Sequence, residues 1–405
     1  MPHETARGDG TTTPRISQVT PAAPTGSSAD VPTARLPLRA GLEGLHPYGA
    51  PQLDVPVLLN VNENPYPPSD AVAADVADAV AKAARGLNRY PDRDFGELRA
   101  ELAEYLRVES GITLAAEQIW AANGSNEVML HLLQAYGGPG RAVLSFAPTY
   151  SMYPEYARDT ITDWVTGRRE EDFGLDAGHA VDMIAQHRPA VILLASPNNP
   201  TGTALPLETV EAILDAARTS GPTGPDGEPT SAVVVVDEAY GEFRRAGTRS
   251  ALTLLADNPH LAVARTMSKA FGMAGLRLGY LAADTALIDH LRVVRLPYHL
   301  SALTQAAALA ALRHREELMA QIASLRSERD RLVTWLRGRG LQVADSDANF
   351  VLFGVLPDRH RVWKGLLDRG ILIREVGPDG WLRVSVGTPE ETAAFTTALE
   401  EVLEQ

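Results

Sequence analysis

The middle of the chain alternates short apolar, β-branched runs with longer patterns of helical period. The short runs lie at 142–146, 161–165, 190–195, 232–237, 261–265 and 278–282. An unbroken apolar run is typical of a strand covered on both faces, and strands joined by helices pair in parallel. The pattern therefore predicts the α/β class, with a large domain whose mostly parallel, mixed sheet has helices on both faces. Ligands then bind at the carboxyl ends of the strands.

Helical patterns flank this region on both sides. On the amino-terminal side they cover 70–85, 97–107 and 128–136, and on the carboxyl side one charged helical stretch covers 301–337. Beyond it, strand patterns at 341–344, 349–353, 371–375 and 381–386 mix with helical patterns at 359–369 and 389–403. This mixture predicts a smaller α+β domain at the carboxyl end.

Composition and charge exclude several classes of function. The 405 residues carry a formal net charge of −14, which repels nucleic-acid backbones and anionic lipid surfaces. No stretch approaches the roughly 20 apolar residues that a membrane-spanning helix needs. The sequence has no cysteine, so disulfides, thiolate metal sites and cysteine nucleophiles are excluded. We therefore expect neither nucleic acid nor a membrane as a partner.

Sequence motifs for metals and nucleotides are missing as well. The ten histidines are scattered without a His-Glu-x-x-His pair, so we expect no metal site. The chain has neither a Gly-x-Gly-x-x-Gly turn after its first strand nor a Gly-Lys-Ser/Thr loop. Residues 1–35 lack the apolar segment of a signal peptide and have little apolar content, which predicts a disordered tail on a cytoplasmic protein.

Four short polar motifs lie where predicted strands end or predicted helices begin. They are 123–127 (Asn-Gly-Ser-Asn-Glu), 196–202 (Ser-Pro-Asn-Asn-Pro-Thr-Gly), 237–240 (Asp-Glu-Ala-Tyr) and the pair 268–269 (Ser-Lys) with an arginine at 277. Each motif is weak alone, and a lysine after a strand is most often a surface residue. Together they meet the separate requirements of one cofactor, pyridoxal phosphate, a pyridine aldehyde that carries a phosphate group.

The ring and the aldehyde of this cofactor need an amine, a carboxylate and hydrogen-bond donors. Lys269 can form an imine with the aldehyde, and Asp237 can keep the pyridine nitrogen protonated. Tyr240 and Asn199 can donate to the ring's phenolic oxygen, and Tyr150 can stack on the ring face. We expect the lysine, the aspartate and Tyr240 to be catalytic. The plainer interpretations are a turn cap for the aspartate and core packing for the tyrosines.

The phosphate of the cofactor needs backbone amides at the start of a helix and a cationic partner. Gly124, Ser125 and Asn126 precede a helical pattern and supply the amides. Ser268 adds a hydroxyl. Arg277 adds a guanidinium, which can bind two phosphate oxygens at once. We therefore expect these residues to bind the cofactor.

These residues, in this order, resemble the fold-type I aminotransferases, and the resemblance extends from about Leu36 to the carboxyl terminus. Within that group the chain is most similar to the histidinol-phosphate aminotransferases. The similarity is carried by the strings at 47–56, 62–65, 89–92, 119–127, 237–240, 265–271, 295–301 and 347–350. It implies the pyridoxal-phosphate fold of type I. It also implies amino transfer from L-glutamate to imidazole-acetol phosphate, which gives 2-oxoglutarate and L-histidinol phosphate in histidine biosynthesis.

The resemblance also implies a homodimer with shared active sites, in which Tyr90 reaches the partner's cofactor phosphate. Arg383 would hold the carboxylate of glutamate, and Arg374 would help to hold the substrate phosphate. Asn64 stands where some relatives have a tyrosine that contacts the substrate phosphate, so recognition there differs. The plainer interpretation of both arginines is a surface ion pair.

Three alternative functions stay open on the sequence alone. Tyr150 and an arginine pair also suit an aromatic amino acid aminotransferase for phenylalanine or tyrosine. The same cofactor serves decarboxylases of phosphorylated amino acids. A transcription regulator that senses the cofactor would need a helix-turn-helix module and a basic face, and the acidic charge balance argues against it.

The predicted elements and motifs divide the chain into five parts. We expect a disordered tail over 1–35 and an N-terminal arm over 36–70 that contributes to the active site. The large cofactor-binding domain then covers 71–300. A linking helical stretch over 301–338 leads to the small C-terminal domain over 339–405.

Overall fold

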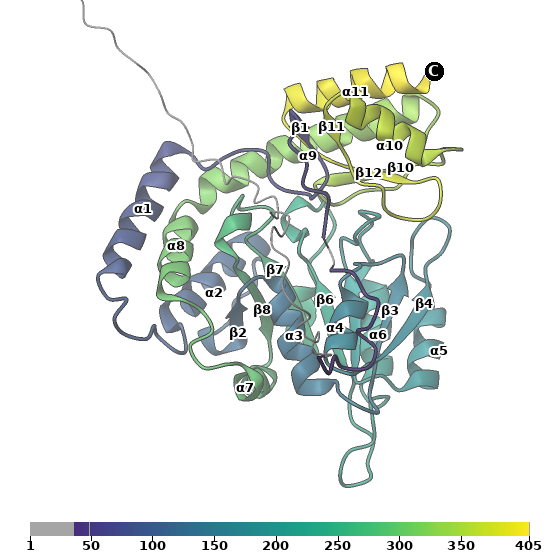
Figure 1. Cartoon of the computed structure of the whole chain (residues 1–405). Helices are drawn as coiled ribbons and strands as arrows, with labels where there is room; N and C mark the ends of the chain where they lie inside the picture. Colours follow the sequence, from purple (N-terminus) through teal and green to yellow (C-terminus); the bar gives the residue numbers. More distant parts are fainter. Residues whose placement is uncertain (1–35, 48, 405) are drawn as a thin grey trace, which may run out of the picture. The chain divides into compact units, whose positions relative to one another are not determined.

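The computed structural model describes residues 36–47 and 49–404 (Figure 1). The chain divides into two compact units between Pro47 and the residue after it. The described part of the first unit, 36–47, contains turns and no helix or strand. All the helices and strands given below belong to the second unit. The disordered tail predicted over 1–35 lies outside the described residues.

A seven-stranded sheet forms the centre of the second unit, in the order β2-β8-β7-β6-β5-β3-β4. Its strands are β2 (Ile119–Ala122), β3 (Ala142–Ala147), β4 (Asp163–Arg168), β5 (Val191–Ala195), β6 (Val233–Asp237), β7 (Leu261–Thr266) and β8 (Gly279–Ala283). The five strands from β4 to β7 pair in parallel, and β8 runs antiparallel to both β7 and β2. The predicted mostly parallel, mixed sheet is confirmed.

Two details of this sheet differ from the sequence expectation. Strand β2 was not predicted, because its short run of apolar residues also fits the approach to a helix. Strand β4 begins after the predicted start at 161, since Ile161 has the left-handed φ of 56° and closes a turn. The other predicted strands of this sheet agree with the structure to within one residue at each end. Outside this sheet, the strand predicted over 371–375 is shorter in the structure and covers only Ile371–Leu372.

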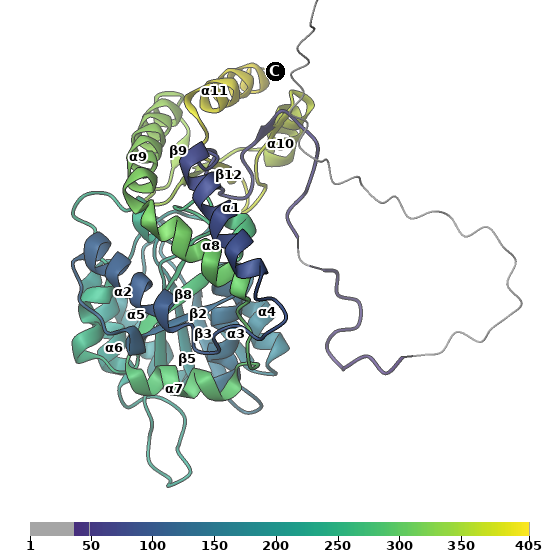
Figure 2. The ribbon, with the colours of Figure 1, turned by 90° about the vertical axis from the view of Figure 1, so that its left-hand side faces the viewer.

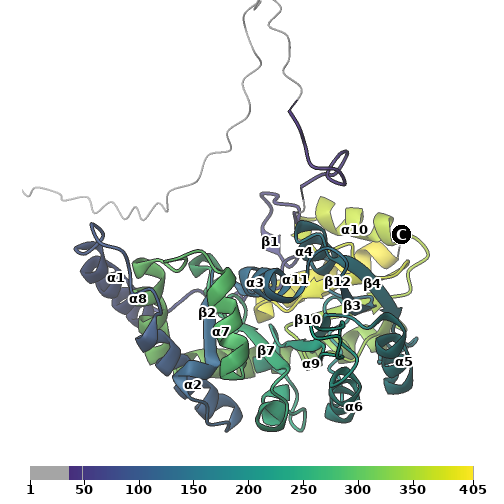
Figure 3. The same ribbon diagram turned by 90° about the horizontal axis from the view of Figure 1, so that it is seen from below.

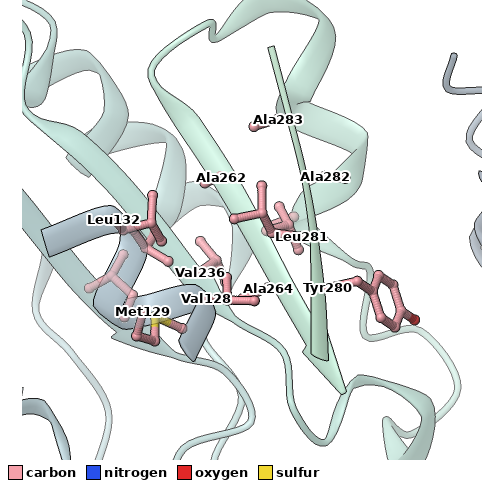
Figure 4. Packing of buried hydrophobic residues seen from close by; sticks show 14 of the residues in the cluster. Val128, Met129, Leu132, Val236, Ala262, Ala264, Tyr280, Leu281, Ala282 and Ala283 are labelled. Carbon is pink, nitrogen blue, oxygen red and sulfur yellow. The ribbon is translucent and has the colours of Figure 1, made fainter. Parts of the chain in front are cut away.

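Helices cover both faces of the sheet (Figure 3). They are α2 (Gly96–Ser110), α3 (Ser125–Tyr136), α4 (Tyr153–Asp159), α5 (Ala177–His187), α6 (Leu207–Ala217) and α7 (Thr285–Val294). Figure 4 shows Val128, Met129 and Leu132 of α3 against the small side chains of β7 and β8. Alanines on these strands let the helix come close, so that the start of α3 lies near the strand ends. The structure also has short 3₁₀ helices, labelled η1 (Ala116–Gln118), η2 (Gly241–Phe243), η3 (Ala251–Asp257) and η4 (Ala274–Leu276).

The helical stretch predicted over 301–337 consists of two helices in the structure, α8 (Ala302–Arg313) and α9 (Arg315–Gly338), which meet at His314. Helix α8 packs along α1 (Asp70–Ala84), as Figures 1 and 2 show. Arg313 and His314, at the break, both bind the carboxylate of Asp75 on α1, with the closest contacts at 3.0 and 3.1 Å. No proline or glycine marks this break, so the helical period alone could not locate it.

The carboxyl-terminal region has its own small sheet and core, as predicted. Strand β10 (Phe350–Gly354) lies between β12 (Leu382–Ser385) and β9 (Gln342–Val343), and both pairs are antiparallel. Helices α10 (Arg359–Asp368) and α11 (Pro389–Leu403) pack with α9 around this sheet. Strand β1 (Val57–Leu58), from the N-terminal arm, pairs in parallel with β11 (Ile371–Leu372). The arm is therefore anchored on the C-terminal region just before it enters the cavity described below.

Candidate active site

A cavity of about 280 Å³ opens at the carboxyl ends of β3, β5, β6 and β7. Three parts of the chain line it: the loops after these strands and the start of α3, residues 60–62 of the arm, and residues 374, 376 and 383 of the C-terminal region. Most of the residues expected from the sequence lie on its wall: Ser125, Asn126, Tyr150, Asn199, Asp237, Tyr240, Ser268, Lys269, Arg277, Arg374 and Arg383. Motifs that are far apart in the sequence therefore meet in one place.

Lys269 follows β7 and reaches into the cavity. Its Nζ donates to the carbonyl oxygen of Val61 over 2.8 Å. Burial, and then the nearby charge of Arg383, lower the pKa of Lys269 to about 8. The sequence has three lysines, and the other two, Lys82 and Lys364, have side chains that are 72% and 53% exposed in ion pairs. Only Lys269 is thus placed to react as a neutral amine.

Asp237 is the last residue of β6 and is buried. Its Oδ2 accepts a hydrogen bond from the hydroxyl of Tyr153 at 3.0 Å, and its Oδ1 accepts one from the amide of Ala239 at 3.1 Å. Burial raises the pKa of Asp237 to about 6, against the opposing effect of these two bonds. A cation placed beside the carboxylate in the cavity would favour its charged form.

The hydroxyl of Tyr240 receives hydrogen bonds from two amide groups. Asn62 Nδ2 lies 3.0 Å from it and Asn199 Nδ2 lies 3.4 Å from it. The ring packs edge-on against Phe350 with the centroids 5.0 Å apart. The other end of the Asn199 amide accepts from Nη1 of Arg383 at 2.5 Å. Asn199 therefore connects Tyr240 to an arginine of the C-terminal region.

One end of the cavity has the features of an anion site. Helix α3 begins at Ser125, after Gly124, whose φ of 86° and ψ of 163° lie in a region that only glycine adopts readily. A Cβ added at Gly124 would lie 2.6 Å from Nη2 of Arg277. Arg277 Nη1 also donates to Ser268 Oγ at 3.3 Å. Amides at a helix start, a hydroxyl and a guanidinium thus converge, which suits a phosphate group.

The other end of the cavity presents two arginines from adjacent backbone. Arg374 and Arg383 form an antiparallel bridge through their backbone groups. Nη2 of Arg383 donates to the carbonyl oxygen of Asn60 at 2.8 Å. Nη1 of Arg374 and the hydroxyl of Thr149 are buried and have no hydrogen-bond partner within 36–47 and 49–404. An anionic group in the cavity would supply partners for both.

The family described as aminotransferase class I and II matches residues 55–399. The chain belongs to this family. It is 59% identical over 368 residues to histidinol-phosphate aminotransferase 3 of Burkholderia lata, with 91% of this chain and 96% of that protein covered. It is also 59% identical over 364 residues to the histidinol-phosphate aminotransferase of Thermobifida fusca, with 90% and 95% covered.

Solved structures of aminotransferases share the fold. A putative histidinol-phosphate aminotransferase from Erwinia carotovora atroseptica has a TM-score of 0.76 and 26% identity, and covers 88% of this chain and 99% of its own. The histidinol-phosphate aminotransferase of Sinorhizobium meliloti, solved in complex with pyridoxal-5'-phosphate, has a TM-score of 0.75 and 24% identity, with 86% and 91% covered. This aminotransferase therefore has the fold of these structures, the fold of type I that the sequence predicts.

The residues that line the cavity of this aminotransferase fit pyridoxal phosphate by their own chemistry. The glycine-only backbone at Gly124 keeps the start of α3 open to a phosphate. The buried carboxylate of Asp237 needs a cationic partner such as a protonated ring nitrogen. The lowered pKa of Lys269 makes a neutral amine available to an aldehyde. Within the described residues, no group of three or more histidine, aspartate or glutamate side chains could hold a metal ion.

Three of the expected site residues do not line the cavity. Gly124 lies just behind its wall, as the residue before α3. Asn64 turns its amide to the carbonyl oxygen of Ala270 at 3.1 Å. Tyr90 is 80% exposed and stacks on Tyr298 with the ring centroids 4.4 Å apart. The roles expected for Asn64 and Tyr90 stay predictions.

Three residues that support the site from behind, Asn62, Tyr153 and Ser385, are not among those expected from the sequence. Asn62 and Tyr153 bind Tyr240 and Asp237, respectively, and Ser385 binds Asn62. Two signals could have pointed to them. The asparagines at 60 and 62 interrupt an apolar run, and Tyr153 lies three residues after Tyr150 in a segment rich in tyrosine.

Proposed function

We propose that this aminotransferase moves an amino group between L-glutamate and imidazole-acetol phosphate, and so forms 2-oxoglutarate and L-histidinol phosphate in histidine biosynthesis. Two curated relatives at 59% identity carry the name of this activity. The observation in this chain that carries the proposal is the pair of arginines on the cavity wall, Arg374 and Arg383. One partner of the reaction is a dicarboxylate and the other a phosphate monoester, and guanidinium groups suit both.

Pyridoxal phosphate, when bound, supplies an aldehyde that combines with amines and a protonated ring that draws electrons from the substrate's α-carbon. Lys269 would take a proton from the substrate's α-carbon as a general base. It would then give a proton, as a general acid, to the carbon that comes from the cofactor's aldehyde. Its pKa of about 8 suits this role, because both protonation states are present near neutral pH. Asp237 holds the proton of the ring nitrogen. Tyr240 donates to the ring's phenolic oxygen.

Other residues of the cavity position the phosphate and the ring of the cofactor. Ser125, Asn126, Ser268 and Arg277 hold the cofactor phosphate together with the backbone at Gly124. Tyr150 packs on the ring face, and Asn199 supports Tyr240 and Arg383 through the contacts at 3.4 and 2.5 Å.

The substrate side of the cavity depends on the C-terminal region. Arg383 binds the substrate carboxylate, and Arg374 binds the substrate phosphate with the guanidinium nitrogen that has no partner within 36–47 and 49–404. Asn64, which the arm carries, is proposed as a substrate-binding residue whose contact differs from that of the tyrosine found in some relatives. The arm over 36–70 thus contributes to a site that is built mainly by the domain over 71–300. The helical stretch over 301–338 joins this large domain to the C-terminal domain over 339–405.

The second part of the proposal is a homodimer with shared active sites. Tyr90, Val293 and Leu296 have side chains that are 76–82% exposed. They lie on neighbouring segments, since Tyr90 stacks on Tyr298, and Arg295 binds Asp94 at 2.8 Å. Exposed apolar side chains that gather on neighbouring segments favour a protein interface, and a second copy would bring its Tyr90 to the cofactor phosphate.

Light scattering tests the dimer directly. We expect a mass near twice the 43.5 kDa of the chain, and a lower mass for Leu296→Asp, which puts a charge into the apolar patch. A wild-type protein with the mass of one chain would contradict the dimer.

Among described helices, none is long and apolar enough to cross a membrane. The cytoplasmic location stays a prediction.

A comparison of kcat/KM for L-histidinol phosphate and L-phenylalanine, each with 2-oxoglutarate as acceptor, tests the substrate. We expect a preference for histidinol phosphate of about 10- to 100-fold or more, because a charge-assisted hydrogen bond contributes about 1.5–3 kcal/mol. Arg374→Met removes most of this preference and leaves the rate with phenylalanine nearly unchanged. Parity of the two substrates in the wild type would favour an aromatic aminotransferase. Release of carbon dioxide without an oxo-acid acceptor would favour a decarboxylase.

A further inference from the structure

The turn before α3 is held by a carboxylate of the helix itself. Glu127 is the third residue of α3, and its Oε2 accepts from the backbone amide of Asn123 at 2.6 Å and from Asn123 Nδ2 at 2.8 Å. A carboxylate in the first turn of a helix interacts favourably with the helix dipole and can reach back to the backbone before the helix. Glu127 forms no ion pair with any residue of 36–47 and 49–404, so its charge is met by these hydrogen bonds and by the helix start.

Two further contacts hold the same turn from other sides. Asn123 Nδ2 also donates to the backbone carbonyl oxygen of His299 at 2.8 Å. The ring of His299 is fixed in turn, since its Nε2 lies 2.9 Å from the carbonyl oxygen of Ala121. Gly279 of β8 lies so close to the turn that an added Cβ would overlap the amide nitrogen of Ser125. The turn therefore has little room to move while Asn123 stays in place.

The backbone amides around the start of α3 divide into two pairs. The amide of Asn123 donates to Glu127, and the next amide donates to the carbonyl oxygen of Ala122 at 2.8 Å. The following two, of Ser125 and Asn126, belong to the first turn of the helix and have no acceptor inside it. Both of these residues line the cavity, whereas Glu127 does not. Glu127 therefore acts on the cavity through the turn.

We propose that Glu127 is a positioning residue for the cofactor phosphate. By binding the amide and the side chain of Asn123, it fixes the turn so that the amides of Ser125 and Asn126 converge on one phosphate group. The inference rests on the place that the proposed function gives the phosphate at the start of α3. The negative charge of Glu127 is not needed for this role, because one oxygen accepts both hydrogen bonds and an amide oxygen also has two lone pairs.

The affinities of the cofactor-free protein for pyridoxal phosphate and for pyridoxal, which lacks the phosphate, test the inference. Glu127→Ala removes the acceptor, and we expect the Kd for pyridoxal phosphate to rise about 10-fold while the Kd for pyridoxal stays unchanged. Glu127→Gln keeps an oxygen in the same place and should give nearly the wild-type values. Fluorescence titration measures both constants. Because the two ligands meet the same variant, a general loss of stability cancels in the ratio of the two Kd values.

Glu391→Ala is the matched control for the loss of a carboxylate from the first turn of a helix. Glu391 is the third residue of α11, and its Oε2 accepts from the backbone amide of Thr388 at 2.8 Å. It does not line the cavity. We expect this variant to lower the melting temperature, as Glu127→Ala does, and to leave both Kd values unchanged.

The outcomes separate this inference from the phosphate site on which it rests. An unchanged ratio of the two Kd values in Glu127→Ala would overturn the inference while the phosphate site stands. An equal rise in Glu127→Gln and Glu127→Ala would also overturn it, since the charge and not the hydrogen bonds would then matter. Equal affinity of the wild-type protein for pyridoxal phosphate and pyridoxal would overturn the phosphate site together with the inference. The preference for histidinol phosphate over phenylalanine is measured on the loaded enzyme and is a separate test of the proposed function.

Discussion

The hydroxyl of Tyr153 lies 3.0 Å from Oδ2 of Asp237, and both side chains are buried. Burial raises the pKa of Tyr153 well above its usual value, so the tyrosine keeps its hydrogen and acts as the donor. The bond favours the charged form of Asp237, whose pKa burial raises to about 6. Helix α4 therefore helps to keep an anion ready for the ring nitrogen of the cofactor.

Replacing Tyr153 by phenylalanine should weaken cofactor binding. A hydrogen bond to a charged group contributes about 1.5–3 kcal/mol, so we expect the Kd for pyridoxal phosphate to rise about 10- to 100-fold. Fluorescence titration of the cofactor-free protein measures this Kd. Tyr280→Phe is the matched control, because Tyr280 is equally buried and its hydroxyl has no hydrogen-bond partner in the described part of the chain. Equal Kd values for the two variants would contradict the role of Tyr153.

The capture of the cofactor should depend on pH through Lys269. Only the neutral amine attacks an aldehyde, and burial beside Arg383 lowers the pKa of Lys269 to about 8. The rate of cofactor binding to the cofactor-free protein should therefore rise about tenfold per pH unit below pH 8 and level off above it. Arg383→Met removes a nearby positive charge and should move the midpoint upward. Stopped-flow absorbance gives the profile, and a midpoint near the ordinary lysine value would count against it.

Gly124→Ala should disturb the phosphate end of the cavity. The backbone at this position, with φ of 86° and ψ of 163°, costs any other residue about 1–3 kcal/mol. The start of α3 would shift, and the Kd for pyridoxal phosphate should rise at least tenfold. Gly338→Ala, with open space around its α-carbon at the end of α9, should leave the Kd unchanged and raise the melting temperature slightly. A wild-type Kd in Gly124→Ala would show that the amides at this helix start do not hold the phosphate.

A buried ion network lies behind the cavity and supports the 237–240 motif. Arg265 of β7 is 0% exposed and binds three carboxylates: Glu238 at 2.7 Å, Glu242 at 3.1 Å and Glu109 at 3.4 Å. Arg244 shares the first and the last of them, at 3.1 and 3.2 Å. Two arginines thus face three carboxylates. Burial raises the pKa of Glu242, and the loss of Arg265 would leave this buried carboxylate without its cationic partner.

Arg265→Met should strongly destabilise the protein, because it leaves buried carboxylates without a counter-charge. Breaking a buried ion pair on one side costs about 3–5 kcal/mol of unfolding free energy. Urea unfolding measures the loss. Arg107→Met, which breaks an exposed pair with Glu104, should change stability little. A similarly small change in Arg265→Met would mean that the network contributes no net stability.

The sequence could predict what depends on local patterns. Apolar runs located the strands, and the polar residues just after them located the cavity, because parallel strands bring their carboxyl ends to one edge. It could not predict contacts between distant segments. Asn62 depends on Ser385, 323 positions away, and the break at His314 depends on Asp75 of another helix. Nothing in the local sequence of these residues records such partners.

Borohydride reduction of the cofactor-loaded protein, followed by peptide mass mapping, tests the central claim most directly. Reduction makes the bond between the cofactor and its lysine permanent, and the chain offers three lysines, of which Lys82 and Lys364 are exposed internal controls. We expect the mass of the reduced cofactor on the peptide that contains Lys269 and on no other. Label on Lys82 or Lys364 instead, or an unlabelled Lys269 peptide in a protein that has bound the cofactor, would contradict the account.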